Sequence, residues 1–97
     1  MIVRADLPRG IQAAQLVHAA GESAPGGLPP GTYAVVLAAR DEGHLALVAK
    51  KLRLAGVPFV AVHEPDAPYS GALMALGIPP ARKEGLRRHL SELPLLR

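Results

Sequence analysis

Two short stretches of this chain place polar side chains directly after an apolar run. The first stretch holds Asp6, Arg9 and Gly10 and leads into a predicted helix. Backbone N–H groups at the start of a helix, together with a nearby arginine, can hold a phosphate or a developing oxyanion. The alternative interpretation is that Arg9 is an ordinary solvated loop charge.

The second stretch, residues 63–70, brings together an imidazole, carboxylates and hydroxyl groups. Glu64 and Asp66 could serve as a general base and as a carboxylate that orients it. Tyr69 and Ser70 could donate hydrogen bonds to a substrate. The sequence Glu-Pro-Asp equally favours a plain turn, because proline and aspartate are both common turn residues.

Gln15 and His18 stand three residues apart on the first predicted helix and could project toward the same cleft. The alternative is a buried His18 with a hydrogen-bond partner, since both faces of this helix carry small or apolar residues. The four histidines of the chain show no spacing typical of a metal site, and we expect no metal and no cofactor. The chain also lacks the glycine-rich and Gly-x-Ser-x-Gly motifs of common nucleotide-binding enzymes and serine hydrolases.

Apolar runs and helical patterns alternate along the chain and predict the elements that position these residues. Strands are predicted over 2–7, 33–39, 59–62 and 72–78. Helices are predicted over 11–20, between the cap Asp41 and Gly56, and between Pro80 and Pro94. The continuously apolar run 33–39 favours a central strand covered on both faces. Residues 21–32, of which seven are Gly or Pro, predict a connector.

The order β-α-β-α-β-β-α indicates an α/β fold and a single domain over 1–97. We expect a three-layer α/β/α sandwich around a four-stranded mixed sheet, with the first three strands parallel. Ligands of such sheets bind beyond the carboxyl ends of the parallel strands. The two polar stretches follow the first and third strands and are therefore expected to face one cleft.

Composition excludes several classes of protein. The chain has 97 residues, of which 49% are hydrophobic, and it contains no cysteine, which excludes disulfides and thiol catalysis. No apolar run approaches the roughly 18 residues of a membrane span, and the first residues lack a signal-peptide layout. We therefore expect a cytoplasmic protein without a membrane partner. Aromatic residues make up 3% of the chain, which argues against a base-stacking platform.

The net charge of +3 lies in the C-terminal segment, residues 81–97. The five basic side chains of this segment are Arg82, Lys83, Arg87, Arg88 and Arg97, against two glutamates. Such a segment can bind phosphate groups or an acidic protein surface. The alternative is the solvated face of an ordinary helix.

A motif-like run opens the chain: Arg4-Ala5-Asp6-Leu7, then Gly10, then Ala13-Ala14-Gln15-Leu16-Val17-His18-Ala19-Ala20. This run resembles the opening of the type II peptidyl-tRNA hydrolases of archaea and eukaryotes. The predicted element order also agrees with that family over nearly the whole chain. The resemblance implies a small α/β/α enzyme, often a homodimer, that uses activated water to cleave the ester between a peptide and the 3′ end of tRNA.

The resemblance also implies roles for the site residues. The ester and the attacking water would be oriented by Gln15, His18, Glu64, Asp66 and Ser70. The tRNA and the substrate would be bound by Asp6, Arg9, Gly10, Tyr69, Arg82, Lys83, Arg87 and Arg88. Where the family carries a functional lysine after the loop glycine, this chain has Ile11. A catalytically weak or inactive relative that binds RNA or protein is therefore the alternative, and a hydrolase or amidase of small molecules is a third interpretation.

Overall fold

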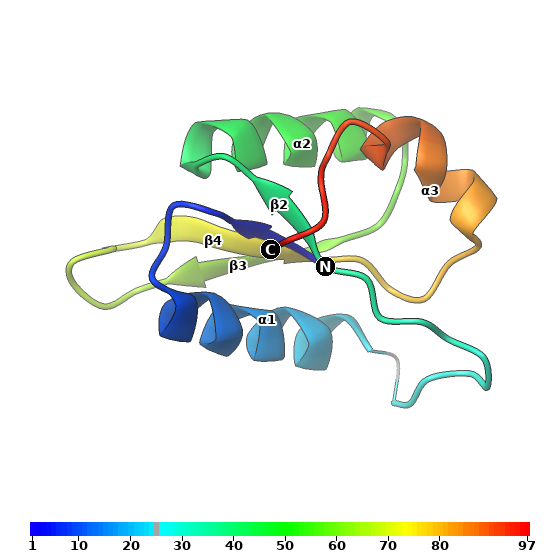
Figure 1. The fold of residues 1–97 in the computed structure, drawn as a ribbon, viewed down its shortest axis with the longest axis horizontal. Coiled ribbons are helices and arrows are strands. Elements are labelled where there is room, and N and C mark those ends of the chain that lie inside the picture. Colours follow the sequence, from blue (N-terminus) through cyan, green and yellow to red (C-terminus); the bar gives the residue numbers. More distant parts are fainter. Residues whose placement is uncertain (25) are drawn as a thin grey trace.

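The computed structural model describes residues 1–24 and 26–97 and contains a four-stranded mixed sheet and three helices (Figure 1). The elements are β1 (Ile2–Arg4), α1 (Arg9–Ser23), β2 (Leu37–Ala39), α2 (Glu42–Leu54), β3 (Val60–Glu64), β4 (Ala72–Gly77) and α3 (Lys83–Leu90). The predicted α/β class is confirmed. Pro25, which belongs to the predicted connector, lies outside the described residues.

The strands lie in the order β2-β1-β4-β3. β1 pairs in parallel with β2, and β4 pairs antiparallel with both β1 and β3. β1, β2 and β3 thus point the same way, but only β1 and β2 form a parallel pair. The sequence did not reveal that β4 lies between β1 and β3, and this insertion places the start of β4 beside the carboxyl end of β1.

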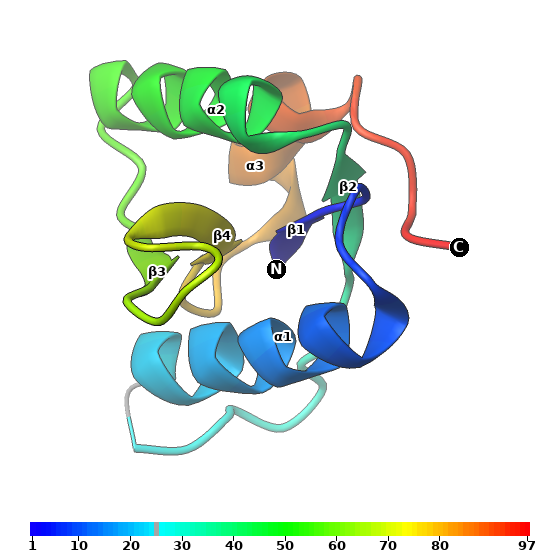
Figure 2. The ribbon, with the colours of Figure 1, turned by 90° about the vertical axis from the view of Figure 1, so that its left-hand side faces the viewer.

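Helices lie on both faces of the sheet, with α1 on one face and α2 and α3 on the other (Figures 1 and 2). Successive residues of a strand point to opposite faces, so Ile2 and Val3 enter two different apolar clusters. Ile2 packs with Leu45 and Leu52 of α2, whereas Val3 packs with Ala19 of α1. All five residues are buried, and the sheet is therefore covered by apolar contacts on both faces.

The face of α1 that packs on the sheet is largely polar: its buried residues are Gln12, Gln15, Ala19 and Ser23. The helix approaches β4 so closely that a Cβ at Gly77 would collide with the carbonyl oxygen of Ala19 and come within 2.9 Å of Ser23 Oγ. A residue with a side chain therefore does not fit at position 77. The predicted helix end at Gly21 is wrong, because α1 continues to Ser23.

The second helix begins and ends where the sequence predicts. The carboxylate of Asp41 accepts a hydrogen bond from the backbone N–H of His44 at 2.9 Å, which caps the first turn of α2. Gly56 follows the helix with a φ of +73°, a conformation that glycine adopts readily. The buried residues of α2 recur at helical spacing and form one stripe: Leu45, Val48, Ala49 and Leu52.

The apolar run 33–39 is not the central strand that the sequence predicted. β2 contains only Leu37–Ala39, and Tyr33 is 89% exposed. On its outer side, β2 is covered by the C-terminal segment, where Ala38 N–H donates to Pro94 O at 2.8 Å and Leu96 N–H donates to Val36 O at 2.9 Å. The run is apolar throughout, but continuous apolarity does not specify which neighbour covers a strand.

Candidate functional site

The carboxyl ends of β1, β2 and β3 lie at one end of the molecule, the left end in Figure 1. The starts of α1 and α2 and the loop between β3 and β4 lie at the same end, which faces the viewer in Figure 2. We call this region the strand-end site. It contains both polar stretches that the sequence singled out.

Asp6 lies in the turn after β1 and is held by Arg4, the last residue of that strand. Arg4 Nε lies 3.0 Å from Asp6 Oδ1, and Arg4 Nη2 lies 2.9 Å from Asp6 Oδ2, which makes a two-bond ion pair. Chiefly through these hydrogen bonds, the Arg4 guanidinium holds the pKa of the Asp6 carboxyl below its usual value. The carboxylate predicted to bind substrate is therefore engaged by Arg4.

Two charged side chains converge on the backbone of Leu73, near the start of β4. The pairing of β3 with β4 shifts here, since Val62 pairs with Ala75 while His63 pairs with Leu73. Arg4 Nη1 donates to Leu73 O at 3.1 Å. On the other side, the backbone N–H of Leu73 donates to Glu42 Oε2 at 2.8 Å. Arg4 and Glu42 thus satisfy the backbone C=O and N–H of Leu73.

The sequence did not single out Arg4 or Glu42 as members of this site. A partial signal exists for each residue, because Arg4 lies two residues from Asp6 on the same side of a strand and Glu42 directly follows a helix cap. Their contacts with Leu73 span 69 and 31 residues along the chain, so no local pattern predicts them.

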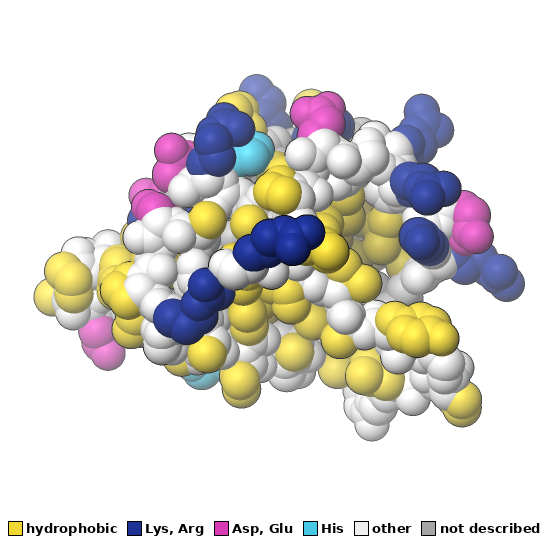
Figure 3. All heavy atoms as spheres, in the orientation of Figure 1, with side chains coloured by type: hydrophobic (Ala, Val, Ile, Leu, Met, Phe, Trp, Pro, Cys, Tyr) yellow, Lys and Arg dark blue, Asp and Glu magenta, His cyan; other side chains and the backbone are white. Residues whose placement is uncertain are grey.

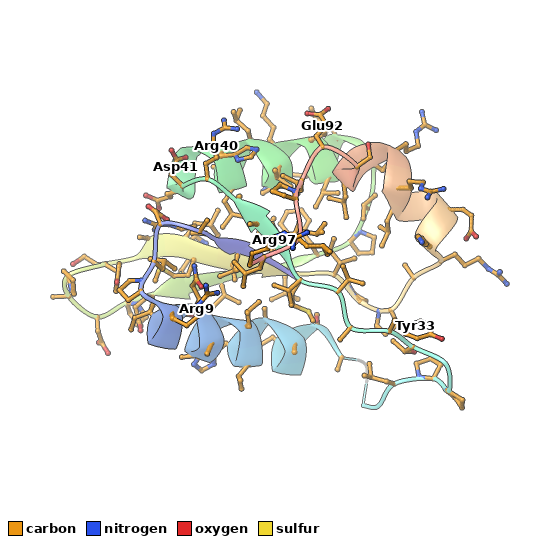
Figure 4. All side chains as sticks on the ribbon, viewed as in Figure 1. Arg9, Tyr33, Arg40, Asp41, Glu92 and Arg97 are labelled. Carbon is orange, nitrogen blue, oxygen red and sulfur yellow. The ribbon has the colours of Figure 1, made fainter. Side chains whose placement is uncertain are left out.

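Arg9 is exposed, as the alternative interpretation expects, but it is the first residue of α1 and forms two hydrogen bonds. Its Nη1 donates to Gln12 Oε1 at 3.1 Å, and its Nη2 donates to the carbonyl oxygen of Arg97 at 2.7 Å. Gln12, which is 4% exposed, donates in turn to Arg4 O at 3.1 Å. Figure 4 shows Arg9 and Arg97 close together, so this arginine joins α1 to the end of the chain.

The first turn of α1 is open on its outer side. Gly10 is exposed, and a Cβ at this position would meet nothing within 4 Å. Pro8 precedes the helix, and no side chain caps its first turn. The N–H groups of this turn therefore keep their positive partial charge toward the surface.

Two carboxylates stand at the end of β3 and in the tight turn that follows it. The carbonyl oxygen of Asp66 accepts from the N–H groups of Tyr69 and Ser70, each at 3.0 Å, and His63 Nδ1 lies 3.0 Å from Gly71 O. Glu64 is half-buried and Asp66 is exposed. Within residues 1–24 and 26–97, neither carboxylate forms a hydrogen bond or an ion pair, so both can act on a ligand.

The structure separates other predicted site residues. Gln15 is 4% exposed and packs under the sheet, whereas His18 is exposed, so they do not form a pair and His18 is not a buried imidazole. The predicted phosphate-binding residues of the last helix are all exposed: Arg82, Lys83, Arg87 and Arg88. They lie on α3 or directly before it, at the end of the molecule opposite the β3–β4 loop, where Figure 3 shows a group of Lys and Arg side chains.

Comparison with known proteins assigns this chain to no family. No protein-family model matches this chain, and no curated protein is detectably similar to it. In the part of the chain that the structure describes, no three His, Cys, Asp or Glu side chains lie close enough together to hold one metal ion. The described helices are also too short or too polar to cross a membrane.

Proposed function

We propose that the protein is a peptidyl-tRNA hydrolase-like enzyme of translation, which cleaves the ester between a peptide and the 3′ end of tRNA. One observation carries this proposal. The carboxylates of Glu64 and Asp66 are unpaired among the described residues and lie at the same end of the molecule as the uncapped first turn of α1. Ester hydrolysis by water needs these two kinds of group, a base and donors for the oxyanion.

Each of these groups has a role in the proposed reaction. Glu64 accepts a proton from water, and the resulting hydroxide attacks the ester carbonyl. The tetrahedral intermediate then collapses, the bond between the carbonyl carbon and the 3′ oxygen of tRNA breaks, and the proton held by Glu64 passes to that oxygen. Asp66 orients the water, and Ser70 donates a hydrogen bond to the substrate. The N–H groups at the start of α1 stabilise the negative charge that forms on the carbonyl oxygen. The side chain of Ile11 supplies no charge, so this stabilisation falls to the backbone.

The proposal has three further parts. The scaffold is a three-layer α/β/α sandwich, the enzyme works in the cytoplasm without a membrane partner, and it forms a homodimer. The resemblance of residues 4–20 to the type II peptidyl-tRNA hydrolases supports each part.

A second candidate is a binding module on the same fold that recognises RNA or an acidic protein through α3. The observation in its favour is the distance between the basic side chains of α3 and the carboxylates of the β3–β4 loop, which lie at opposite ends of a molecule 37 Å long. The internal contacts of Asp6 and Arg9 favour it further, because these residues then stabilise the fold.

The deciding experiment follows the release of free tRNA from an N-blocked aminoacyl-tRNA. We expect turnover by the unmodified protein, and a loss of about a hundredfold or more in Glu64→Gln and Asp66→Asn. Glu84→Gln is the matched control, because it neutralises an exposed carboxylate on α3. Equal turnover in all four proteins would contradict the proposed roles of Glu64 and Asp66.

The double substitution of Arg87 and Arg88 by alanine separates the two candidates. In an enzyme that binds the acceptor end, hydrolysis of a minimal ester substrate persists in this variant. In a binding module, association with tRNA or an acidic protein is lost and no protein of the series shows turnover. The difference in the salt dependence of tRNA binding between the unmodified protein and this variant measures how many phosphate contacts the two arginines make.

A further inference from the structure

A cavity of about 300 Å³ lies on the face of the sheet opposite α1, between α2 and the segment that follows α3. Its walls carry the cations Arg40 and Lys51, the imidazoles of His44 and His89, and one carboxylate, that of Glu92. Figure 4 shows Arg40 directly before α2 and Glu92 beyond α3. The proposed hydrolase does not use any of these five residues.

The two cations of the cavity are weakly engaged. Among the described residues, the Arg40 guanidinium forms no hydrogen bond and no ion pair. Lys51 Nζ lies 3.7 Å from Glu92 Oε1, and these side chains are 47% and 85% exposed. An exposed pair at this distance contributes little to stability, so an anion can displace it at low cost.

The orientation of His44 is fixed by a backbone group. The N–H of Arg40 donates to His44 Nδ1 at 2.9 Å. Since this ring nitrogen accepts a hydrogen bond, the proton of the neutral imidazole lies on Nε2, which is left as a donor. His44, His89 and Glu92 are not close enough together to form a metal site within the described chain. The Nε2–H of His44 is therefore a hydrogen-bond donor on the wall of the cavity.

The floor of the cavity is apolar. Val48 is 7% exposed and Leu93 is 9% exposed, and both line the cavity beneath the charged rim. A ligand that fills this space needs an anionic group for the rim and an apolar group for the floor. The rim holds two cations, and a phosphate monoester carries nearly two negative charges near neutral pH, whereas a carboxylate carries one.

We propose that this cavity binds a small phosphate monoester, whose phosphate lies between Arg40 and Lys51 and whose apolar group lies on Val48 and Leu93. The Glu92 carboxylate opposes the bound phosphate by like charge. It therefore weakens the site, and its removal strengthens binding.

The test measures the binding of phenyl phosphate to the full chain by calorimetry and by NMR of the histidine rings. We expect the signals of His44 and His89 to shift, and Arg40→Ala and Lys51→Ala to weaken binding by about tenfold or more. Lys50→Ala is the matched control, because it removes the same charge from the same helix at an exposed position outside the cavity. Glu92→Gln should tighten binding by about threefold.

Three results would overturn the proposal. Equal losses in Lys50→Ala and Lys51→Ala would mean that binding reflects overall charge. Benzoate binding as tightly as phenyl phosphate would mean that the phosphate is not recognised. Binding without any change in the His44 or His89 signals would place the ligand elsewhere. The substituted side chains are exposed, and circular dichroism of each variant confirms that its fold is intact.

Discussion

Charged side chains are used differently in the strand-end site and in the cavity between α2 and α3. At the strand ends, Arg4 binds Asp6 and Leu73 O, and Glu42 binds Leu73 N–H. In the cavity, the Arg40 guanidinium forms no hydrogen bond and no ion pair within the described residues. The Lys51 ammonium lies 3.7 Å from its ion-pair partner, the Glu92 carboxylate. The first group of charges stabilises the fold, and the second group is available to a ligand.

Burial accounts for the difference between the Arg4 side chain, which has partners within the fold, and the Arg40 side chain, which has none among the described residues. The Arg4 side chain is 12% exposed, and a guanidinium that loses its water requires partners of opposite charge or strong acceptors. Arg40 lies at the surface and stays hydrated, so its charge needs no partner within the fold. A charged residue that lies beside a strand end can therefore serve to stabilise the fold and need not bind a ligand. Five substitutions test this contrast.

Arg4→Leu should have the largest effect. It leaves Leu73 O without its donor in a partly buried place and the more exposed Asp6 carboxylate without its partner, and we expect a loss of about 1–3 kcal/mol in the free energy of unfolding. Urea titration followed by circular dichroism measures this loss. A loss below about 1 kcal/mol would show that Arg4 is as dispensable as an exposed arginine.

Glu42→Ala should rank second, with a loss of about 1–2 kcal/mol. The substitution removes the acceptor of Leu73 N–H, and it also removes a negative charge from the first turn of α2. Glu84→Ala is a close control, since Glu84 stands in the first turn of α3 and only the helix-end charge is lost there. Similar losses in both variants would mean that the bond to Leu73 contributes nothing.

The contribution of Asp6 should depend on pH. Its folded pKa is lowered by Arg4, so its stabilising effect is present above the unfolded pKa of about 4 and disappears as the pH falls through the lowered folded value. We expect Asp6→Asn to be less stable than the unmodified protein at pH 7 by less than about 1 kcal/mol, because the Asp6 side chain is 40% exposed. The two proteins should converge in acid, and about 1 M NaCl should reduce the difference at pH 7. A difference that grows toward low pH would contradict the ion pair.

Arg40→Ala and Lys51→Ala should have the smallest effect. Both residues are exposed, and we expect each variant to unfold within about 0.5 kcal/mol of the unmodified protein. Thermal and urea unfolding, in the absence of any phosphate ester, make the comparison with Arg4→Leu direct. A loss above about 1.5 kcal/mol would mean that the cavity charges also stabilise the fold.

Sequence patterns predicted the structure best where the interacting residues are close together in the chain. The start of α2 was predictable, because the Asp41 cap bonds to a residue only three positions away. They failed for α1, where Gln15 is buried and His18 is exposed, since both faces of this helix carry similar small residues. They failed also for Tyr33, whose apolar neighbours suggested a buried strand.

The sequence predicts where in the fold the candidate site lies, but not which side chains contact one another there. The polar residues after β1 and β3 do lie at one end of the molecule, as the direction of the strands required. The sequence nevertheless predicts Asp6 and Arg9 as binding residues, whereas in the structure Asp6 contacts Arg4 and Arg9 contacts Arg97. The cavity between α2 and α3 had no local signal, because its walls come from segments about 40 residues apart in the chain.

The sequence by itself determined the α/β class, the order of the elements along the chain and the stripe that α2 buries, since each depends on periodicity and on hydrogen bonds within a few residues. Only the tertiary structure decided the strand order, the insertion of β4 between β1 and β3, and the partners of Arg4, Arg9 and Glu42. These partners are 69, 88 and 31 residues distant along the chain. Contacts at such separations form only when the whole core closes, because the chain must first offset the entropy of bringing its distant segments together.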